Sequence, residues 1–166
     1  MGKKARYVRD TQNYRQFILD KGVIAAKSDY HLLCHIARLV NEGFYEYGER
    51  LRRVPVTIGG TSYIPPIPVE NDVKDHIVSL SQLEKSPVEV AIDLCLYCMK
   101  AQLFNDGNKR ASVIFANHYL IGKGEGLLVI PESRVGEFKA LLIAWYEGKD
   151  NLLIRDFMME VCWREF

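Results

Sequence analysis

The sequence predicts an all-α fold, a helical bundle with one β-hairpin. Apolar residues recur every three or four positions along most of the chain, as they do on the buried face of a helix. Only residues 54–64 combine β-branched side chains with a Gly-Gly turn, which is the pattern of a hairpin. With 166 residues, 48% of them hydrophobic, the chain can fill one core but not comfortably two. We expect one globular unit over residues 28–166, preceded by a helical extension over residues 1–27.

Capping signals and periodicity then place the elements in order. The clearest helix start is Ser86-Pro87-Val88-Glu89, where serine can cap the helix, proline suits its first turn and glutamate closes a capping box. Residues 127–130 are apolar and bounded by glycine and proline, which indicates a short extended run. The helices that we expect span residues 13–21, 29–50, 70–83, 87–103, 109–122, 133–147 and 151–164.

Composition narrows the class of protein. The 22 basic and 21 acidic residues leave a formal net charge of +1, so the chain lacks the broad basic surface of a nucleic-acid-binding or membrane-binding protein. Four basic residues near the N-terminus are not followed by an apolar run, which argues against a secretory signal. Cys95 and Cys98 fall within a predicted helix without a second pair of ligands, so we expect buried thiols there. A cytoplasmic protein is the expectation.

The most informative segment is the turn at residues 102–110, Gln-Leu-Phe-Asn-Asp-Gly-Asn-Lys-Arg, between two apolar helices. A helix that begins near Asn108 directs its free amides and the positive end of its dipole at this turn, which favours an anion. Gly107 allows backbone amides to approach an oxyanion closely. Lys109 and Arg110 add positive charge, and Asp106 has the oxygen ligands that Mg²⁺ prefers. The turn suits a Mg²⁺-bound polyphosphate, although its composition fits an ordinary helix-helix turn equally well.

Two motifs carry a resemblance to a known family. The turn is similar to the signature of the Fic (filamentation induced by cAMP) family, H-x-F-x-[DE]-G-N-[GK]-R, at every fixed position except the first. Upstream, residues 57–66, Thr-Ile-Gly-Gly-Thr-Ser-Tyr-Ile-Pro-Pro, resemble the family's flap, a hairpin followed by Pro-Pro and a helix. The similarity is strongest over residues 42–121. It implies a Fic-like helical bundle in which the hairpin is the flap.

The resemblance also implies an activity. Fic enzymes transfer AMP from ATP, with Mg²⁺, to a Ser, Thr or Tyr hydroxyl of a target protein docked on the flap. Carried over residue by residue, it implies nucleotide contacts from the signature turn, a metal ligand, and flap residues that hold the target. These are Gly107, Asn108, Lys109 and Arg110 for the nucleotide, Asp106 for the metal, and Thr61, Ser62 and Tyr63 for the target.

The first signature position departs from the family in a way that bears on catalysis. Gln102 stands where Fic enzymes have the histidine that takes the proton from the attacking hydroxyl. An amide is not basic enough to accept that proton, and general-base catalysis typically contributes about 10²–10⁴-fold. We therefore expect low or lost activity, and a non-catalytic module that binds nucleotide and protein is the alternative. The sequence leaves open whether Gln102 reflects drift, a dedicated pseudoenzyme or an inactivating substitution.

Other positions bear on the reaction and its control. The death-on-curing toxin of the same family has lysine at the position of Lys109, which raises phosphoryl transfer as a third, weaker alternative. Ser133 and Glu137 fit only part of the family's inhibitory helix motif, and we interpret Ser133 as a helix cap. The resemblance leaves an antitoxin or other regulatory protein and a homo-oligomer open as partners.

Overall fold

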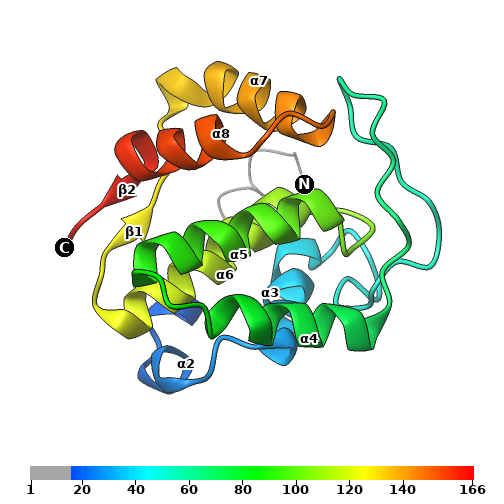
Figure 1. The fold of residues 1–166 in the computed structure, drawn as a ribbon. Coiled ribbons are helices and arrows are strands. Elements are labelled where there is room, and N and C mark those ends of the chain that lie inside the picture. The colour runs from blue at the N-terminus through cyan, green and yellow to red at the C-terminus, as the bar shows by residue number, and fades with distance from the viewer. Residues whose placement is uncertain (1–15) are drawn as a thin grey trace.

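The computed structural model describes residues 16–166, and over this range the fold is mostly helical, as predicted (Figure 1). Residues 16–19 are helical, which covers the described part of the predicted helix 13–21; its residues 13–15 lie outside the described range. The further helices are α2 (Lys21–Ala25), α3 (Tyr30–Asn41), α4 (Glu70–Ser81), α5 (Pro87–Ala101), α6 (Asn108–Lys123), α7 (Val135–Tyr146) and α8 (Leu152–Phe157), with a 3₁₀ turn at Glu132–Arg134 and a π turn at Met158–Cys162.

Helices α5 and α6 form the centre of the molecule. In Figure 1, α5 crosses the middle of the view, with α4 below it and α7 and α8 above it. Two clusters of buried apolar side chains fill the space on either side. One joins α5 and α6 to α7 and α8, and the other joins them to α3 and α4. Because both clusters share this helix pair, the turn between α5 and α6 is held by packing from both sides.

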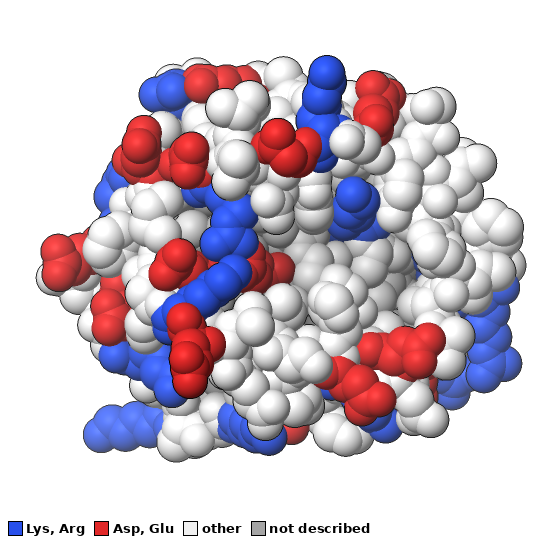
Figure 2. Space-filling view, in the orientation of Figure 1, with Lys and Arg blue, Asp and Glu red and all other residues white. Residues whose placement is uncertain are grey.

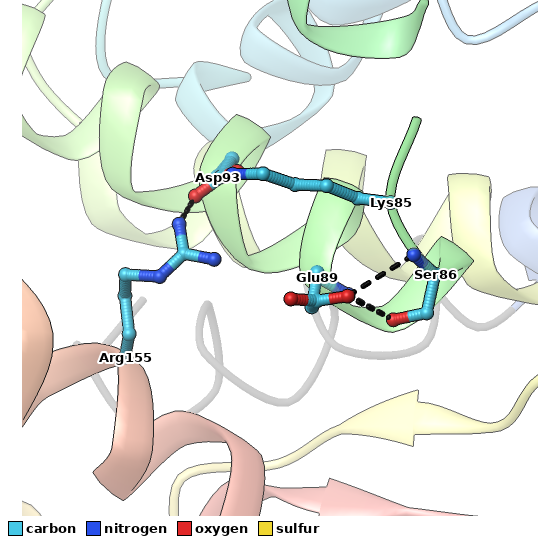
Figure 3. A network of polar contacts seen from close by, with 5 residues as sticks. All are labelled: Lys85, Ser86, Glu89, Asp93 and Arg155. Carbon is cyan, nitrogen blue, oxygen red and sulfur yellow. Dashed lines mark hydrogen bonds and ion pairs between the residues drawn. The ribbon is translucent and has the colours of Figure 1, made fainter. Parts of the chain in front are cut away.

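The start of α5 has the predicted capping box (Figure 3). The Ser86 Oγ accepts a hydrogen bond from the Glu89 amide at 3.3 Å, and the Glu89 carboxylate accepts one from the Ser86 amide at 3.1 Å. Bonds from the Ser86 side chain and backbone lower the pKa of Glu89. One turn further, Asp93 binds Arg155 of α8 and, at 2.8 Å, Lys85. The pair between Asp93 and Arg155 joins α8 to α5.

Two predicted helices end earlier than expected. Helix α3 stops at Asn41 instead of residue 50, because Gly43 adopts a φ of +79° and the chain then turns. The last helix, predicted over 151–164, gives way to the π turn and to strand β2 (Trp163–Arg164). Strand β2 pairs antiparallel with β1 (Leu127–Leu128), with Leu127 opposite Arg164. The predicted extended run at 127–130 is confirmed over these two residues, and its pairing partner was not predicted.

The flap, residues 54–64, differs from the predicted hairpin. Its turn is present, with a φ of +87° at Gly60 and a bond from the Thr61 amide to the Ile58 carbonyl at 3.4 Å. No strand is assigned between residues 51 and 69, so the two arms do not form a ladder. Proline at 55, 65 and 66 removes backbone donors from both arms, which explains the absence of pairing. The flap is therefore an extended loop.

His118 and the buried cysteines have structural roles rather than catalytic ones. His118 is 2% exposed and joins α6 to the N-terminal segment, through the Ser28 hydroxyl at 2.7 Å and the Val23 carbonyl at 2.5 Å. Cys95 and Cys98 are buried free thiols, as predicted, and burial raises the pKa of Cys98 to about 12. Among residues 16–166, no helix has both the length and the apolar character that a membrane crossing requires.

Candidate functional site

The turn between α5 and α6 is held in shape by the side chain of its first residue. Gln102 has a φ of +47°, the only positive φ at a described residue other than glycine, and it ends α5 in the left-handed region. Its Nε2 donates to the Met99 carbonyl at 2.7 Å, and that carbonyl also accepts the Tyr146 hydroxyl at 3.0 Å. The Gln102 side chain therefore stabilises the end of α5.

Asn108 closes the turn from the other end. Its Oδ1 accepts from the Phe104 amide at 2.8 Å, and its Nδ2 donates to the Phe104 carbonyl at 2.8 Å and to the Gln102 Oε1 at 3.3 Å. The residue is 7% exposed. Its amide is thus engaged in binding residues 102–108 into one unit, a structural role that sequence reasoning did not assign to it.

The position of Gly107 has no room for a side chain. Its φ is +73°, and an added Cβ would lie 2.5 Å from the Val40 Cγ1 and 2.9 Å from the Asn41 Oδ1. It is the N-cap of α6, and no side chain caps this helix. The first helical bond runs from the Ala111 amide to the Gly107 carbonyl. The amides of residues 108–110 therefore remain available at the positive end of α6, a suitable place for an anion.

A cavity of about 320 Å³ opens onto this helix end. One wall is the signature turn, and the other is the first arm and turn of the flap, Val56, Thr57, Ile58 and Gly59. Lys109 and Arg110 line it and are exposed, and neither is in an ion pair among the described residues. Partial desolvation and the charge of Lys139 on α7 lower the pKa of Lys109. The cavity thus brings together two cations without an ion-pair partner, the free amides at the start of α6, and Gly107, which has no side chain to block them.

A model of the Fic/DOC family matches residues 27–120, more than half of the chain. The chain belongs to the Fic/DOC family. The match covers the flap and the signature turn, the two segments that bound the cavity. A comparison of the sequence with curated proteins found no match.

Solved Fic structures share the fold. The BepC protein, a VirB-translocated effector from Bartonella tribocorum crystallised with bound AMPPNP, has a TM-score of 0.70 at 15% identity, over 99% of this chain and 90% of that one. The N-terminal Fic domain of a VirB-translocated Bep effector from Bartonella quintana, with bound ADP, has a TM-score of 0.68 at 13% identity, over 99% and 87%. A Fic domain containing signaling protein from Bacteroides thetaiotaomicron has a TM-score of 0.62 at 18% identity, over 80% and 55%.

The structure brings together most of the site residues predicted from the Fic resemblance. Gln102 and all of residues 106–110 line the cavity. Thr61, Ser62 and Tyr63 do not line it, and Tyr63 instead stacks on Tyr146 with ring centroids 5.7 Å apart. Their role in holding a target stays a prediction. Sequence reasoning missed the flap residues 56–59 as a wall of the cavity, although their place before the Gly-Gly turn marked them as part of the flap.

No described histidine lines the cavity. His118 is buried and hydrogen-bonded to the N-terminal segment, and His35 stacks on Phe17. His76 packs against Tyr97, with ring centroids 4.2 Å apart. None of these three side chains is placed to stand in for the missing signature histidine. The cavity of this Fic protein thus has the groups that bind an anion but no imidazole to accept a proton.

A larger groove, of about 590 Å³, lies between α4, α5 and Trp145 of α7. Figure 2 shows a pale hollow on this face, with basic and acidic side chains interleaved beside it. The groove is lined largely by apolar and aromatic side chains, among them Leu96, Tyr97 and Leu103. The smaller cavity has the free amides and cations that suit a polyphosphate, whereas the larger groove has mostly apolar walls.

Arg52 connects the flap to the signature turn. It is 1% exposed, and no acidic side chain lies within ion-pair distance of it among the described residues. Its guanidinium donates to carbonyls at both ends of the flap, those of Val54 at 2.9 Å and Pro66 at 2.5 Å, and to the Gln102 carbonyl at 2.5 Å. Burial lowers the pKa of Arg52. A single side chain thereby fixes the base of the flap to the turn.

We expect Arg52→Met to lower the free energy of unfolding by about 1–3 kcal/mol, because several buried carbonyls lose their donor. The flap should also exchange its amide hydrogens faster. Arg53→Met is the matched control, since Arg53 is the exposed neighbour, and it should change stability by no more than about 0.5 kcal/mol. Urea unfolding and hydrogen exchange measure both effects. Equal losses in the two variants would contradict the role of Arg52.

Proposed function

We propose that this Fic-family protein binds the triphosphate of ATP in the cavity between the flap and the start of α6. The proposal rests on one observation above all: the uncapped α6 N-terminus, the side-chain-free Gly107 and two unpaired cations face the same 320 Å³ space. The bound AMPPNP and ADP of the two Bartonella structures support it by analogy of fold. We further propose that the scaffold is that of an AMP-transferring enzyme.

Asp106 is the residue that would hold Mg²⁺. Its Oδ1 accepts a hydrogen bond from the Gly107 amide at 2.6 Å, which fixes the carboxylate in the wall of the cavity. No group of three or more His, Cys, Asp or Glu side chains converges in residues 16–166, so the described chain offers no complete cage for a metal. One carboxylate fits Mg²⁺ nevertheless, because this ion keeps several waters and is commonly shared with substrate phosphates. When bound, it would neutralise phosphate charge.

In AMP transfer, the oxygen of a target hydroxyl attacks the α-phosphorus, the bond from that phosphorus to the bridging oxygen breaks, and pyrophosphate leaves. The hydroxyl proton must go to a base. In this chain the amides of residues 108–110 and the cations would bind and orient the phosphates, whereas Gln102 cannot take the proton. We therefore propose weak turnover. Target segments would lie along the flap, whose unpaired arms offer free backbone groups, with Thr61, Ser62 and Tyr63 near the target.

A non-catalytic module is the second candidate, and the absence of histidine from the described cavity wall favours it. Such a module would bind ATP and a protein partner without transfer.

Calorimetric titration with ATP and Mg²⁺ tests the part that both candidates share. We expect binding to the parent protein, and we expect it to weaken about two- to fivefold in Arg110→Gln, since an exposed charge contact contributes up to about 1 kcal/mol. The assignment of the cavity is contradicted if Arg110→Gln binds ATP as tightly as the parent protein, or if the parent protein does not bind ATP. Arg164→Gln, at the far end of the chain in β2, is the charge-matched control.

A further inference from the structure

The larger groove lies between elements that are far apart in the sequence. Helix α4 forms one side, Trp145 of α7 and Arg155 of α8 lie on the opposite side, and α5 runs between them (Figure 1). Tyr63 of the flap and residues 66–69 also line it. No residue lines both this groove and the cavity at the start of α6. The volume of about 590 Å³ is within the usual range of small-molecule sites, roughly 300–1,000 Å³.

The charged side chains of the groove leave one cation without a carboxylate. Three Lys and Arg side chains but only two carboxylates line it. Asp93 pairs with both Arg155 and, at 2.8 Å, Lys85 (Figure 3). Asp72 lies in the first turn of α4, where the helix dipole favours a carboxylate. Lys100 has no ion-pair partner among the described residues, so the excess positive charge of the groove lies there.

Neutral groups hold the ammonium of Lys100 in place. Its Nζ lies 4.5 Å from the centroid of the Trp145 ring and 5.5 Å from that of Tyr63. It donates one hydrogen bond, to the Trp145 carbonyl at 3.4 Å. The rings and the carbonyl attract the ammonium but carry no net charge to neutralise it. Because an ammonium has three N–H donors, two of them remain for a ligand at this half-buried position.

We propose that the groove between α4, α5 and Trp145 binds a small aromatic acid, with its anionic group on Lys100 and its rings among the apolar side chains. Leu96, Leu103 and the paired rings of His76 and Tyr97 line the groove, and they suit an aromatic body. The unmatched charge of Lys100 selects an acid. This ligand site is separate from the nucleotide cavity and does not depend on the proposed function.

Two fluorescent probes that differ in one charge test the proposal on the full chain. Anilinonaphthalene sulfonate has the rings and an anionic group, and phenylnaphthylamine has the same rings without it. Both should bind the parent protein. Lys100→Met should weaken the anionic probe about three- to tenfold, between the contributions of an exposed and a buried charge contact. It should leave the neutral probe unchanged, which also shows that the groove is intact.

Lys123→Met is the matched control, since it makes the same change in net charge at the end of α6, outside the groove. It should leave the binding of both probes unchanged. The effect of Lys100→Met on the anionic probe should shrink in high salt, because charges near the surface are screened.

The two tryptophans of the chain report where the probes bind. Trp145 lines the groove, whereas Trp163 does not, and the Nε1 of Trp163 donates to the Glu125 carbonyl at 2.8 Å. In NMR spectra, each probe should therefore shift the indole N–H signal of Trp145 and leave that of Trp163 in place.

The outcomes separate this proposal from the proposed function. It is overturned if neither probe binds, if binding leaves Trp145 unshifted, or if Lys100→Met binds the anionic probe as tightly as the parent protein. ATP with Mg²⁺ should displace neither probe; displacement would place the nucleotide in this groove and overturn both proposals. If the probes bind as described but ATP does not bind, the acid site stands and the proposed function is wrong.

Discussion

Gln102→His should raise transfer of the α-phosphate label of ATP to protein about 10²–10⁴-fold over the parent chain, the usual contribution of a general base. The turn is already built to orient a histidine. The Met99 carbonyl, which accepts the Gln102 Nε2 at 2.7 Å, can accept one ring N–H, which leaves the other nitrogen as the acceptor that faces the cavity. Asn108 keeps its two bonds to Phe104, so the turn should hold its shape.

The measurement uses α-labelled and γ-labelled ATP with cell lysate. Because the imidazole must be neutral to accept a proton, the rate of Gln102→His should rise with pH toward and beyond about 6.5. Gln102→Leu, which has neither a base nor a hydrogen-bonding group, is the control and should stay inactive. Label from the γ-phosphate alone would indicate phosphoryl transfer, and ATP binding without either label would support the non-catalytic module instead.

Gly107→Ala should lower the free energy of unfolding by about 2–5 kcal/mol. The left-handed conformation costs a residue with a Cβ about 1–2 kcal/mol, and overpacking against Val40 and Asn41 adds about 1–3 kcal/mol. Nucleotide binding should be lost as well, because the first amides of α6 must move to relieve the contact. Urea unfolding and calorimetry measure the two effects.

Substitutions at two other glycines separate the conformational cost of Gly107→Ala from its packing cost. Gly124 has a φ of +71° but nothing within 4 Å of an added Cβ, so Gly124→Ala should cost only the conformational part, about 1–2 kcal/mol. Gly136 has neither constraint and lies in α7, so Gly136→Ala should stabilise by about 0.5–1 kcal/mol. If Gly107→Ala is as mild as Gly124→Ala, the close packing behind the signature turn does not limit this position.

Local signals in the sequence were sufficient for the helices and for one side of the site. The capping box at Ser86 placed the start of α5 at its observed residue, and glycine at 107 marked the sharp entry to α6. The capping box depends on contacts between residues a few positions apart, which a sequence pattern records directly. Gln102 and residues 106–110 therefore meet at one cavity, as the pattern indicated.

The errors and omissions involve contacts between distant parts of the chain. The pairing of β1 with β2 joins residues 127–128 to 163–164, and apolar periodicity over 151–164 concealed it. Arg52 donates to carbonyls at the base of the flap, a contact between distant residues that has no sequence motif of its own.

Hydrogen exchange of individual backbone amides, with and without ATP and Mg²⁺, tests the central claim most directly. The claim is that the amides at the start of α6 bind the phosphates. It predicts slower exchange at residues 107–110 when ATP is present, with little change at the apolar groove between α4 and α5. Protection at that groove with none at residues 107–110 would contradict it.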